Sequence, residues 1–199
     1  MSQFTVFETA IGWAGLAWGD GGLIGTCLPE PDPQAVRRGF ARRCPEAVEA
    51  ACAPAEFQPA VAAIRALMRG EKADLSRVRL DPTRVPEFNA RVYEIARTIP
   101  PGETLTYGEI ATRLGDRLLA RDVGAALGQN PWPVVVPCHR VTAAGGKLGG
   151  FSARGGAHTK LRLLQIEGAP AASLPDPSSR SGRKGAKPPG PETGDLFRL

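Results

Sequence analysis

The sequence is poor in the residues that build metal and disulfide sites. Its 199 residues include two histidines and four cysteines, and the cysteines, Cys27, Cys44, Cys52 and Cys138, lie far apart. No pair has the Cys-x2-Cys spacing of a zinc site, and both histidines are remote in sequence from the first three cysteines. We therefore expect no metal centre and no disulfide framework, and ordinary core or surface thiols at the first three positions.

Long apolar runs are also absent. No stretch approaches the ~18 apolar residues of a membrane-spanning helix, and the N-terminal residues 1–5 lack the basic start of a secretion signal. The composition, 42% hydrophobic and 23% charged, is typical of a soluble globular protein. We expect a cytoplasmic protein without a membrane partner.

Acidic residues are outnumbered by basic residues only after position 84. Basic and acidic residues number 10 and 10 in residues 1–84, 10 and 7 in residues 85–168, and 5 and 3 in residues 169–199. The net charge of +5 therefore lies in the half that contains Cys138 and in the C-terminal segment. This distribution is compatible with a nucleic-acid partner.

The first part of the chain predicts strands followed by helices. Residues 4–28 read as short strands separated by turn-forming residues, notably at 19–22. Apolar residues then recur at helical spacing in residues 33–43 and 55–69, and residues 77–80 predict a last strand. This order is typical of an α/β (α+β) fold, and we predict an N-terminal supporting domain over residues 1–81.

The second part predicts mainly helices. Pro86 marks one helix start. Thr106 with Glu109 three residues later forms the pattern of a capping box, and Gly115 ends the helix that this box begins. A further helix around residues 120–127 makes the pair a candidate helix-turn-helix, although an ordinary helical hairpin gives the same pattern.

The end of the chain predicts one more helix, over residues 159–168, and then a tail. The apolar contacts of that helix are assigned to Leu161, Leu164 and Ile166. Proline, glycine, serine and basic residues dominate residues 169–199, which we predict to be a disordered basic tail. Together, the helices predicted from Pro86 to residue 168 define a C-terminal domain over residues 82–168.

Cys138 has the sequence environment of a nucleophile. Val134–Val136 favour an extended strand, and Pro137 ends it, so we expect Cys138 at the end of a rigid strand. A thiol with the usual pKa of ~8.5 is largely protonated at neutral pH and needs help to ionise. His139 and Arg140 place a proton acceptor and a positive charge beside it.

These residues carry a resemblance to a known family. Pro-Cys-His-Arg-Val at 137–141, preceded by Asn-Pro at 130–131 and followed by Ile-Glu-Gly at 166–168, is similar to the O6-alkylguanine-DNA alkyltransferases over residues 80–168. The resemblance implies a monomer that binds double-stranded DNA containing O6-alkylguanine. It also implies irreversible transfer of the alkyl group to the protein, once per molecule and without a cofactor.

The resemblance also assigns roles to four residues near the nucleophile. Cys138 corresponds to the alkyl acceptor, and His139 to the base that takes its proton through a water molecule. Glu167 corresponds to the acid that hydrogen-bonds this histidine. Asn130 corresponds to the buried asparagine that braces the turn beside the site.

Further residues correspond to the parts that hold DNA and the lesion. Arg121 matches the arginine that enters the base stack in place of the flipped nucleotide, and Tyr107 matches the tyrosine that helps rotate the 3′ phosphate. Val141, Phe151 and Ser152 match the lesion pocket. Phe151 stands where relatives often have tyrosine, and the loop from Ser152 onward is longer than the common Ser-Gly-Gly form.

Three other functions fit parts of the pattern. A lesion-binding module would flip O6-alkylguanine without repairing it, but such alkyltransferase-like proteins typically replace the acceptor cysteine, which this chain keeps as Cys138. A helix-turn-helix regulator would bind a specific DNA sequence whether or not Cys138 is present. A thiol hydrolase would turn over a small acyl substrate many times.

Overall fold

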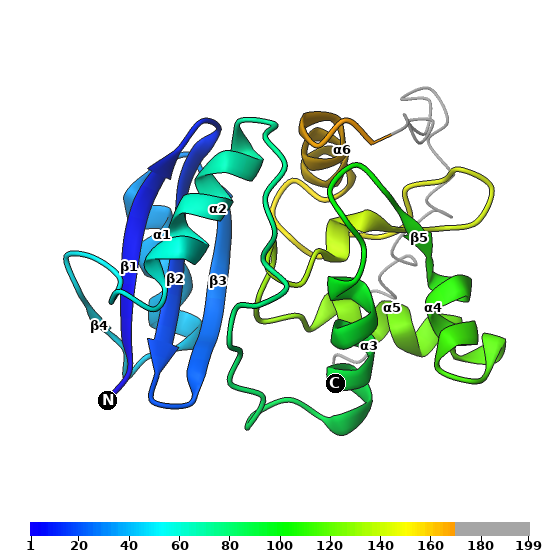
Figure 1. Cartoon of the computed structure of the whole chain (residues 1–199), viewed down its shortest axis with the longest axis horizontal. Helices are drawn as coiled ribbons and strands as arrows, with labels where there is room; N and C mark the ends of the chain where they lie inside the picture. The colour runs from blue at the N-terminus through cyan, green and yellow to red at the C-terminus, as the bar shows by residue number, and fades with distance from the viewer. Residues whose placement is uncertain (170–199) are drawn as a thin grey trace, which may run out of the picture.

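The computed structural model describes residues 1–169. A sheet with its helices forms one side of the molecule, and a mainly helical part forms the other (Figure 1). The elements of the first side are β1 (Gln3–Thr9), β2 (Gly12–Gly19), β3 (Gly22–Glu30), α1 (Pro33–Arg43), β4 (Val48–Glu49) and α2 (Gln58–Met68). Those of the second are α3 (Glu87–Arg97), β5 (Leu105–Thr106), α4 (Tyr107–Arg113), η1 (Arg117–Leu119), α5 (Ala120–Gly128), η2 (Cys138–Arg140), β6 (Val141–Thr142) and α6 (Ala157–Ile166).

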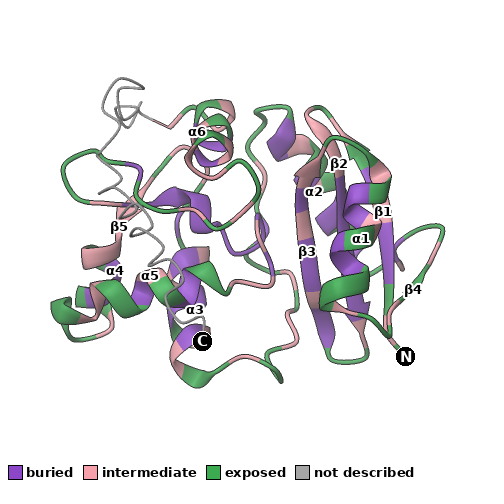
Figure 2. Cartoon of the chain, turned by 180° about the vertical axis from the view of Figure 1, so that it is seen from behind, coloured by how far each residue is buried: buried purple, intermediate pink, exposed green. Residues whose placement is uncertain are grey.

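The N-terminal sheet has the strand order β3-β2-β1-β4. The antiparallel meander of β1, β2 and β3 confirms the predicted strands, and β4 adds a short parallel edge beside β1. Helices α1 and α2 cover opposite faces of the sheet (Figures 1 and 2). Phe4 packs with Phe40 of α1, whereas Phe7 belongs to the core on the α2 side, as the alternation of side chains along a strand requires.

The strand predicted at residues 77–80 does not form. Only Leu80 makes a bridge to β3, opposite Leu23, where the Leu23 amide donates to the Arg79 carbonyl (2.9 Å) and the Asp81 amide donates to the Leu23 carbonyl (2.9 Å). The same edge of β3 is occupied farther along by the segment that precedes Cys138. A longer strand therefore has no free edge to pair with.

The predicted capping box at the start of α4 is confirmed. The Thr106 hydroxyl accepts from the Glu109 amide (3.1 Å), and the Glu109 carboxylate accepts from the Thr106 amide (2.6 Å). After α4, Gly115 has a φ of 107°, a conformation that favours glycine. The short turn η1 then leads into α5, so the two helices lie in the predicted order of a helix-turn-helix.

The strand predicted at Val134–Val136 is wrong. This segment is a compact turn in which Val134 has a φ of 76° and the Val136 amide donates to the Trp132 carbonyl (2.7 Å). Proline has no N–H group to donate to the hydrogen bonds between strands, and Pro131, Pro133 and Pro137 flank these valines. Cys138 therefore begins the 3₁₀ turn η2 and does not end a strand.

Strand β3 holds this turn through hydrogen bonds to the backbone carbonyls of two of the prolines. The Thr26 amide donates to the Pro131 carbonyl (2.9 Å), and the Thr26 hydroxyl donates to the Pro133 carbonyl (2.6 Å). The Trp132 indole donates to the Leu23 carbonyl (2.7 Å). The two sides of the molecule thus share hydrogen bonds next to the cysteine.

One hydrophobic cluster also runs through both sides. It contains buried residues of the sheet and α2, such as Leu16 and Leu67, together with Val92 of α3 and Leu163 of α6. Figure 2 colours these buried segments purple in both the sheet and the helical part. The segment that carries Cys138 is built into this cluster and is held rigidly from several directions.

Two expectations concern the ends and the surroundings of the chain. Over residues 1–169, no helix is both long and apolar enough to cross a lipid bilayer. The predicted disordered tail, residues 169–199, lies outside the described residues from position 170 onward.

Candidate active site

Cys138 lines a cavity of about 530 Å³ between α4, α5 and the loop that precedes α6. Four other predicted site residues line the same cavity: Tyr107, Arg121, Phe151 and Ser152. They come from positions up to 45 residues apart in the chain, 107 to 152. The fold thus brings the predicted nucleophile and the predicted DNA and lesion contacts to one place.

The cysteine itself is almost completely buried, with 9% of its surface exposed. Burial raises the pKa of the Cys138 thiol, because the charged form is poorly solvated. A hydrogen bond from Asn130, the positive charge of Lys160 and nearby backbone amides oppose this rise. These contacts offset part of the cost of burial, although the net shift of the Cys138 pKa is still upward.

Asn130 connects the cysteine to the turn that precedes it. Its side-chain amide donates to the Val136 carbonyl (2.8 Å), and its side-chain oxygen accepts from the Trp132 amide (2.9 Å). These two bonds close the turn around Val134, which has the strained left-handed backbone. Asn130 itself is partly buried, and its bracing role stays a prediction.

His139 is fully buried directly behind the cysteine. Its Nε2 lies 3.0 Å from Oε1 of Glu167, whereas its Nδ1 has no hydrogen-bond partner among the described residues. Burial lowers the pKa of His139, so the ring is neutral near pH 7. With a carboxylate at Nε2, that nitrogen carries the proton and Nδ1 is left as an acceptor.

Glu167 is held by Arg140 as well as by His139. Arg140 donates from Nε to Oε2 (2.8 Å) and from Nη2 to Oε1 (2.8 Å), and its Nη1 donates to the Ile99 carbonyl (2.6 Å). Burial alone would raise the pKa of Glu167, but the hydrogen bonds from His139 and Arg140 outweigh it and bring the pKa to about 2. The carboxylate therefore stays ionised.

The remaining predicted residues form the cavity wall and its surroundings. The Tyr107 hydroxyl donates to the Gly150 carbonyl (3.1 Å), and the Ser152 hydroxyl donates to the Gly128 carbonyl (3.2 Å). Arg121 is exposed on α5. Val141, predicted for the lesion pocket, does not line this cavity. It pairs with Leu105 in β6, and its carbonyl accepts from the Lys160 ammonium.

Lys160 is a feature of the site that the sequence reasoning missed. Its side chain is fully buried in α6, on the same face as Leu163 and Leu164. The predicted apolar residues Leu161 and Ile166 are only partly buried. Lys160, Leu163 and Leu164 have the i, i+3, i+4 spacing of one helical face, and that spacing was the available signal.

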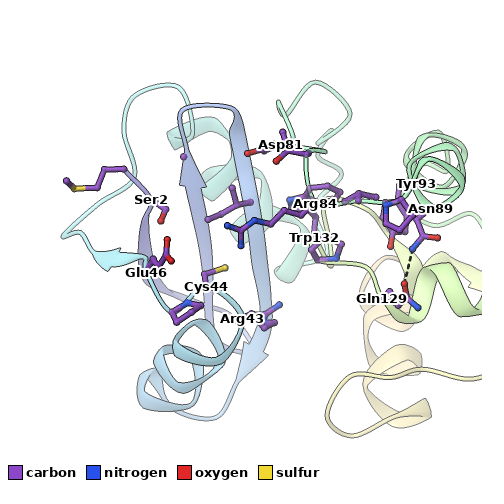
Figure 3. A pocket seen from close by; sticks show the side chains of 18 residues that line it. Ser2, Arg43, Cys44, Glu46, Asp81, Arg84, Asn89, Tyr93, Gln129 and Trp132 are labelled. Atoms are coloured by element: carbon purple, nitrogen blue, oxygen red, sulfur yellow. Dashed lines mark hydrogen bonds between the residues drawn. The ribbon is translucent and has the colours of Figure 1, made fainter.

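A second cavity, of about 470 Å³, lies between the sheet and α3 (Figure 3). Its wall includes Cys44, Arg84 and Trp132, and Asn89 donates to Gln129 (3.1 Å) at one end. None of the predicted site residues lines it.

Across residues 1–169, no group of three or more His, Cys, Asp or Glu side chains is placed to hold a metal ion.

The fold and the site define a class of protein: a helix-turn-helix unit attached to a buried cysteine with a histidine and a carboxylate behind it. A family model described as "6-O-methylguanine DNA methyltransferase, DNA binding domain" matches residues 87–169. The chain is 45% identical over 114 residues, 57% of its length, to the methylated-DNA–protein-cysteine methyltransferase of Mycobacterium tuberculosis, covering 67% of that protein. The chain belongs to the methylated-DNA–protein-cysteine methyltransferase family.

Two further similarities bear on the function. The crystal structure of Mycobacterium tuberculosis OGT in complex with DNA has a TM-score of 0.66 and 37% identity, covering 85% of this chain and 96% of that one. A DNA base-flipping protein of Thermus thermophilus is 43% identical over 107 residues, 54% of this chain and 70% of that protein.

Proposed function

We propose that this protein repairs O6-alkylguanine in double-stranded DNA by moving the alkyl group irreversibly onto Cys138. The observation that carries this proposal is the shared cavity of Cys138, Tyr107, Arg121, Phe151 and Ser152 beside the helix-turn-helix. Family membership supports the same reaction. Residues 82–168 would form the DNA-binding and acceptor domain, with residues 1–81 as its support.

The transfer begins with ionisation of the thiol. The proton of Cys138 passes through a water molecule to Nδ1 of His139, the buried nitrogen that lacks a partner among the described residues. The imidazolium that forms is stabilised by Glu167, which remains a carboxylate because Arg140 also binds it. Arg140 and Glu167 thus prepare the histidine and do not touch the substrate.

The thiolate then attacks the alkyl carbon in line with the bond to O6. The new sulfur–carbon bond forms as the carbon–oxygen bond breaks, and the electron pair of that bond moves onto the guanine. The guanine takes up the proton that the thiol gave to His139, returned through water, so the products are guanine and S-alkylcysteine and the histidine is neutral again. No step regenerates the thiol, and each molecule acts once.

The substrate base has to leave the duplex to reach the cavity, because Cys138 is only 9% exposed. Arg121 is exposed on α5 at the cavity rim, where its side chain can fill the space left in the base stack. Tyr107 begins α4 and lines the same cavity, and we assign to it the contact with the 3′ phosphate. We propose a monomer that acts on DNA in the cytoplasm.

The direct test is the intact mass and tryptic map after mixing with duplex DNA that contains one O6-methylguanine. We expect one added methyl group per molecule, located on the peptide that contains Cys138. Cys138→Ala should gain none. Cys52→Ala, which removes an exposed cysteine outside the cavity, should gain as much as the unaltered protein.

The rival function is base flipping without repair, favoured by the similarity to the DNA base-flipping protein. It predicts tight binding to the lesion duplex with no change in mass. The presence of Cys138 with the acceptor nitrogen of His139 behind it supports transfer instead. Binding that survives with no mass gain on Cys138 would decide for the rival.

A further inference from the structure

The ammonium group of Lys160 is buried without an acidic partner among the described residues. Its side chain has no exposed surface, and Nζ donates to the carbonyl of Val141. The group also lies 5.5 Å from the centre of the Tyr107 ring and 5.9 Å from that of Phe151. No ion pair within residues 1–169 includes Lys160. A buried, unpaired charge is costly, so its retention next to the cavity calls for a counter-charge.

The groups that face Lys160 identify this counter-charge. Tyr107 is not an anion, because burial raises its pKa further above neutral pH. His139 is neutral, and the charge of Lys160 disfavours its protonated form. Cys138 remains, because it lines the same cavity as Tyr107 and Phe151, the two rings that lie against the Lys160 ammonium. The positive charge of Lys160 favours the Cys138 thiolate, and the thiolate favours the charged form of Lys160.

We propose that Lys160 is the counter-ion of the Cys138 thiolate, a positioning residue that lowers the cost of ionising the sulfur inside the lesion pocket. The aromatic faces of Tyr107 and Phe151 and the carbonyl of Val141 hold the ammonium there in the absence of substrate. The proposal rests on the proposed function, since it explains how that reaction acquires its nucleophile.

The division of work between Lys160 and His139 follows from their charges. Burial lowers the pKa of Lys160 and the thiolate of Cys138 opposes this shift, and together they bring the pKa to about 8, so the lysine keeps its proton near pH 7. A protonated lysine cannot accept the proton of the thiol. His139 therefore takes the proton, and Lys160 stabilises the charge that remains on the sulfur.

The first test measures the ionisation of Cys138 without DNA. The rate at which iodoacetamide alkylates the Cys138 peptide, followed by mass spectrometry over a range of pH, reports the thiolate fraction. In Lys160→Met, which keeps the length and loses the charge, the midpoint should rise by about one pH unit, and alkylation near pH 7 should be about tenfold slower. Lys160→Arg should recover part of the loss, because it restores the charge.

Lys147→Met provides the matched control, because Lys147 is exposed in the loop before α6 and lies outside the cavity. Its profile should equal that of the unaltered protein. An unchanged midpoint in folded Lys160→Met would overturn the proposal. Methyl transfer from duplex DNA is measured separately, so failure of the repair function would appear there while the thiol titration still decides the role of Lys160.

A second measurement leaves Lys160 in place and covers the case in which Lys160→Met does not fold. Coupling between two titrating groups is reciprocal, so the thiolate must shift the titration of the lysine. The ¹³Cε signal of Lys160, followed by NMR over a range of pH, should titrate at lower pH in Cys138→Ser than in the unaltered protein. Identical titrations in the two proteins would overturn the proposal.

Discussion

His139 Nε2 lies 3.0 Å from Oε1 of Glu167, and the two side chains are 0% and 3% exposed. Arg140 binds the same carboxylate through two N–H groups. The arrangement links two consecutive residues of the turn at Cys138, His139 and Arg140, to the end of α6. The ion pairs of Glu167 therefore contribute to the stability of the fold as well as to the chemistry of His139. The contribution to stability can be measured by its dependence on pH.

The stability contributed by Glu167 should be lost in acid. The pKa of Glu167 falls from about 4.5 in the unfolded chain to about 2 in the folded protein, so the unfolded chain binds more protons between these values. The stabilisation is present above pH 4.5 and disappears as the pH falls toward 2, an effect of about 3 kcal/mol. Urea unfolding from pH 7 to pH 2 should show the difference between the unaltered protein and Glu167→Gln shrinking by this amount.

An exposed carboxylate gives the comparison for that measurement. Glu71 pairs with Arg69 at the surface, where solvent screens the interaction. Glu71→Gln should follow the unaltered protein closely at every pH. A stability difference for Glu167→Gln that stays constant down to pH 2 would show that folding does not lower the pKa of Glu167.

Removing the side chain of Asn130 should affect stability and reactivity together. In Asn130→Ala the Trp132 amide loses its partner and the Val136 carbonyl keeps only the Cys138 amide, which should lower the free energy of unfolding by about 1–3 kcal/mol. The Cys138 thiol also loses a hydrogen bond that favours its ionised form, so its reaction with iodoacetamide should slow.

The neighbouring residue provides the control for this prediction. Gln129 is exposed and accepts one bond from Asn89, away from the cysteine. Gln129→Ala should leave the reactivity of Cys138 unchanged. Equal thiol reactivity in Asn130→Ala and in the unaltered protein would count against the contact of Asn130 with the sulfur.

The parts of the fold that sequence predicted well depend on local interactions. The face of α2 made by Val61, Ile64 and Leu67 is buried as its spacing indicated. The capping box of Thr106 and Glu109 also lies within one turn of chain. Each of these features depends on residues three or four positions apart, so it can be predicted from the local spacing of residues in the sequence.

The parts that sequence could not predict depend on distant partners. Val134–Val136 have the composition of a strand, yet Thr26 and Leu23 of β3 bind the surrounding prolines and Trp132 and fold the segment into a turn. Lys160 shows the same limit for the site, because its burial is explained by Val141, Tyr107 and Cys138 and not by its own helix.

Arg121→Ala should impair repair of duplex DNA without impairing the thiol. The Arg121 side chain is proposed to fill the gap left by the flipped base and so to offset the cost of unstacking, a few kcal/mol. Without it that cost is no longer offset, and transfer from duplex DNA should slow by about tenfold or more. Reaction of Cys138 with iodoacetamide should not change, since Arg121 is exposed at the rim.

A second arginine separates this role from a general effect of charge. Arg77→Ala removes the same charge from an exposed position outside the cavity, in the N-terminal part of the chain. It should leave transfer from duplex DNA near its original rate. If both variants slow transfer equally, Arg121 acts only as one of many positive charges.

The final prediction concerns the packing of Gly149 against Tyr107. A Cβ atom at position 149 would lie 2.8 Å from the Tyr107 ring, so an alanine there has to push the tyrosine out of the cavity wall. Gly149 also has a φ of 73°, which costs any other residue about 1 kcal/mol. Gly149→Ala should therefore lower both stability and the rate of methyl transfer from duplex DNA.

Gly145 isolates the contribution of the ring contact. Its φ of 71° is nearly the same, but nothing lies within 4 Å of a Cβ atom placed there. Gly145→Ala should show the backbone cost of about 1 kcal/mol alone, with transfer preserved. Because the two substitutions share one backbone penalty, the excess loss of transfer in Gly149→Ala measures what the position of Tyr107 contributes, and equal transfer rates would show that the cavity works without that contact.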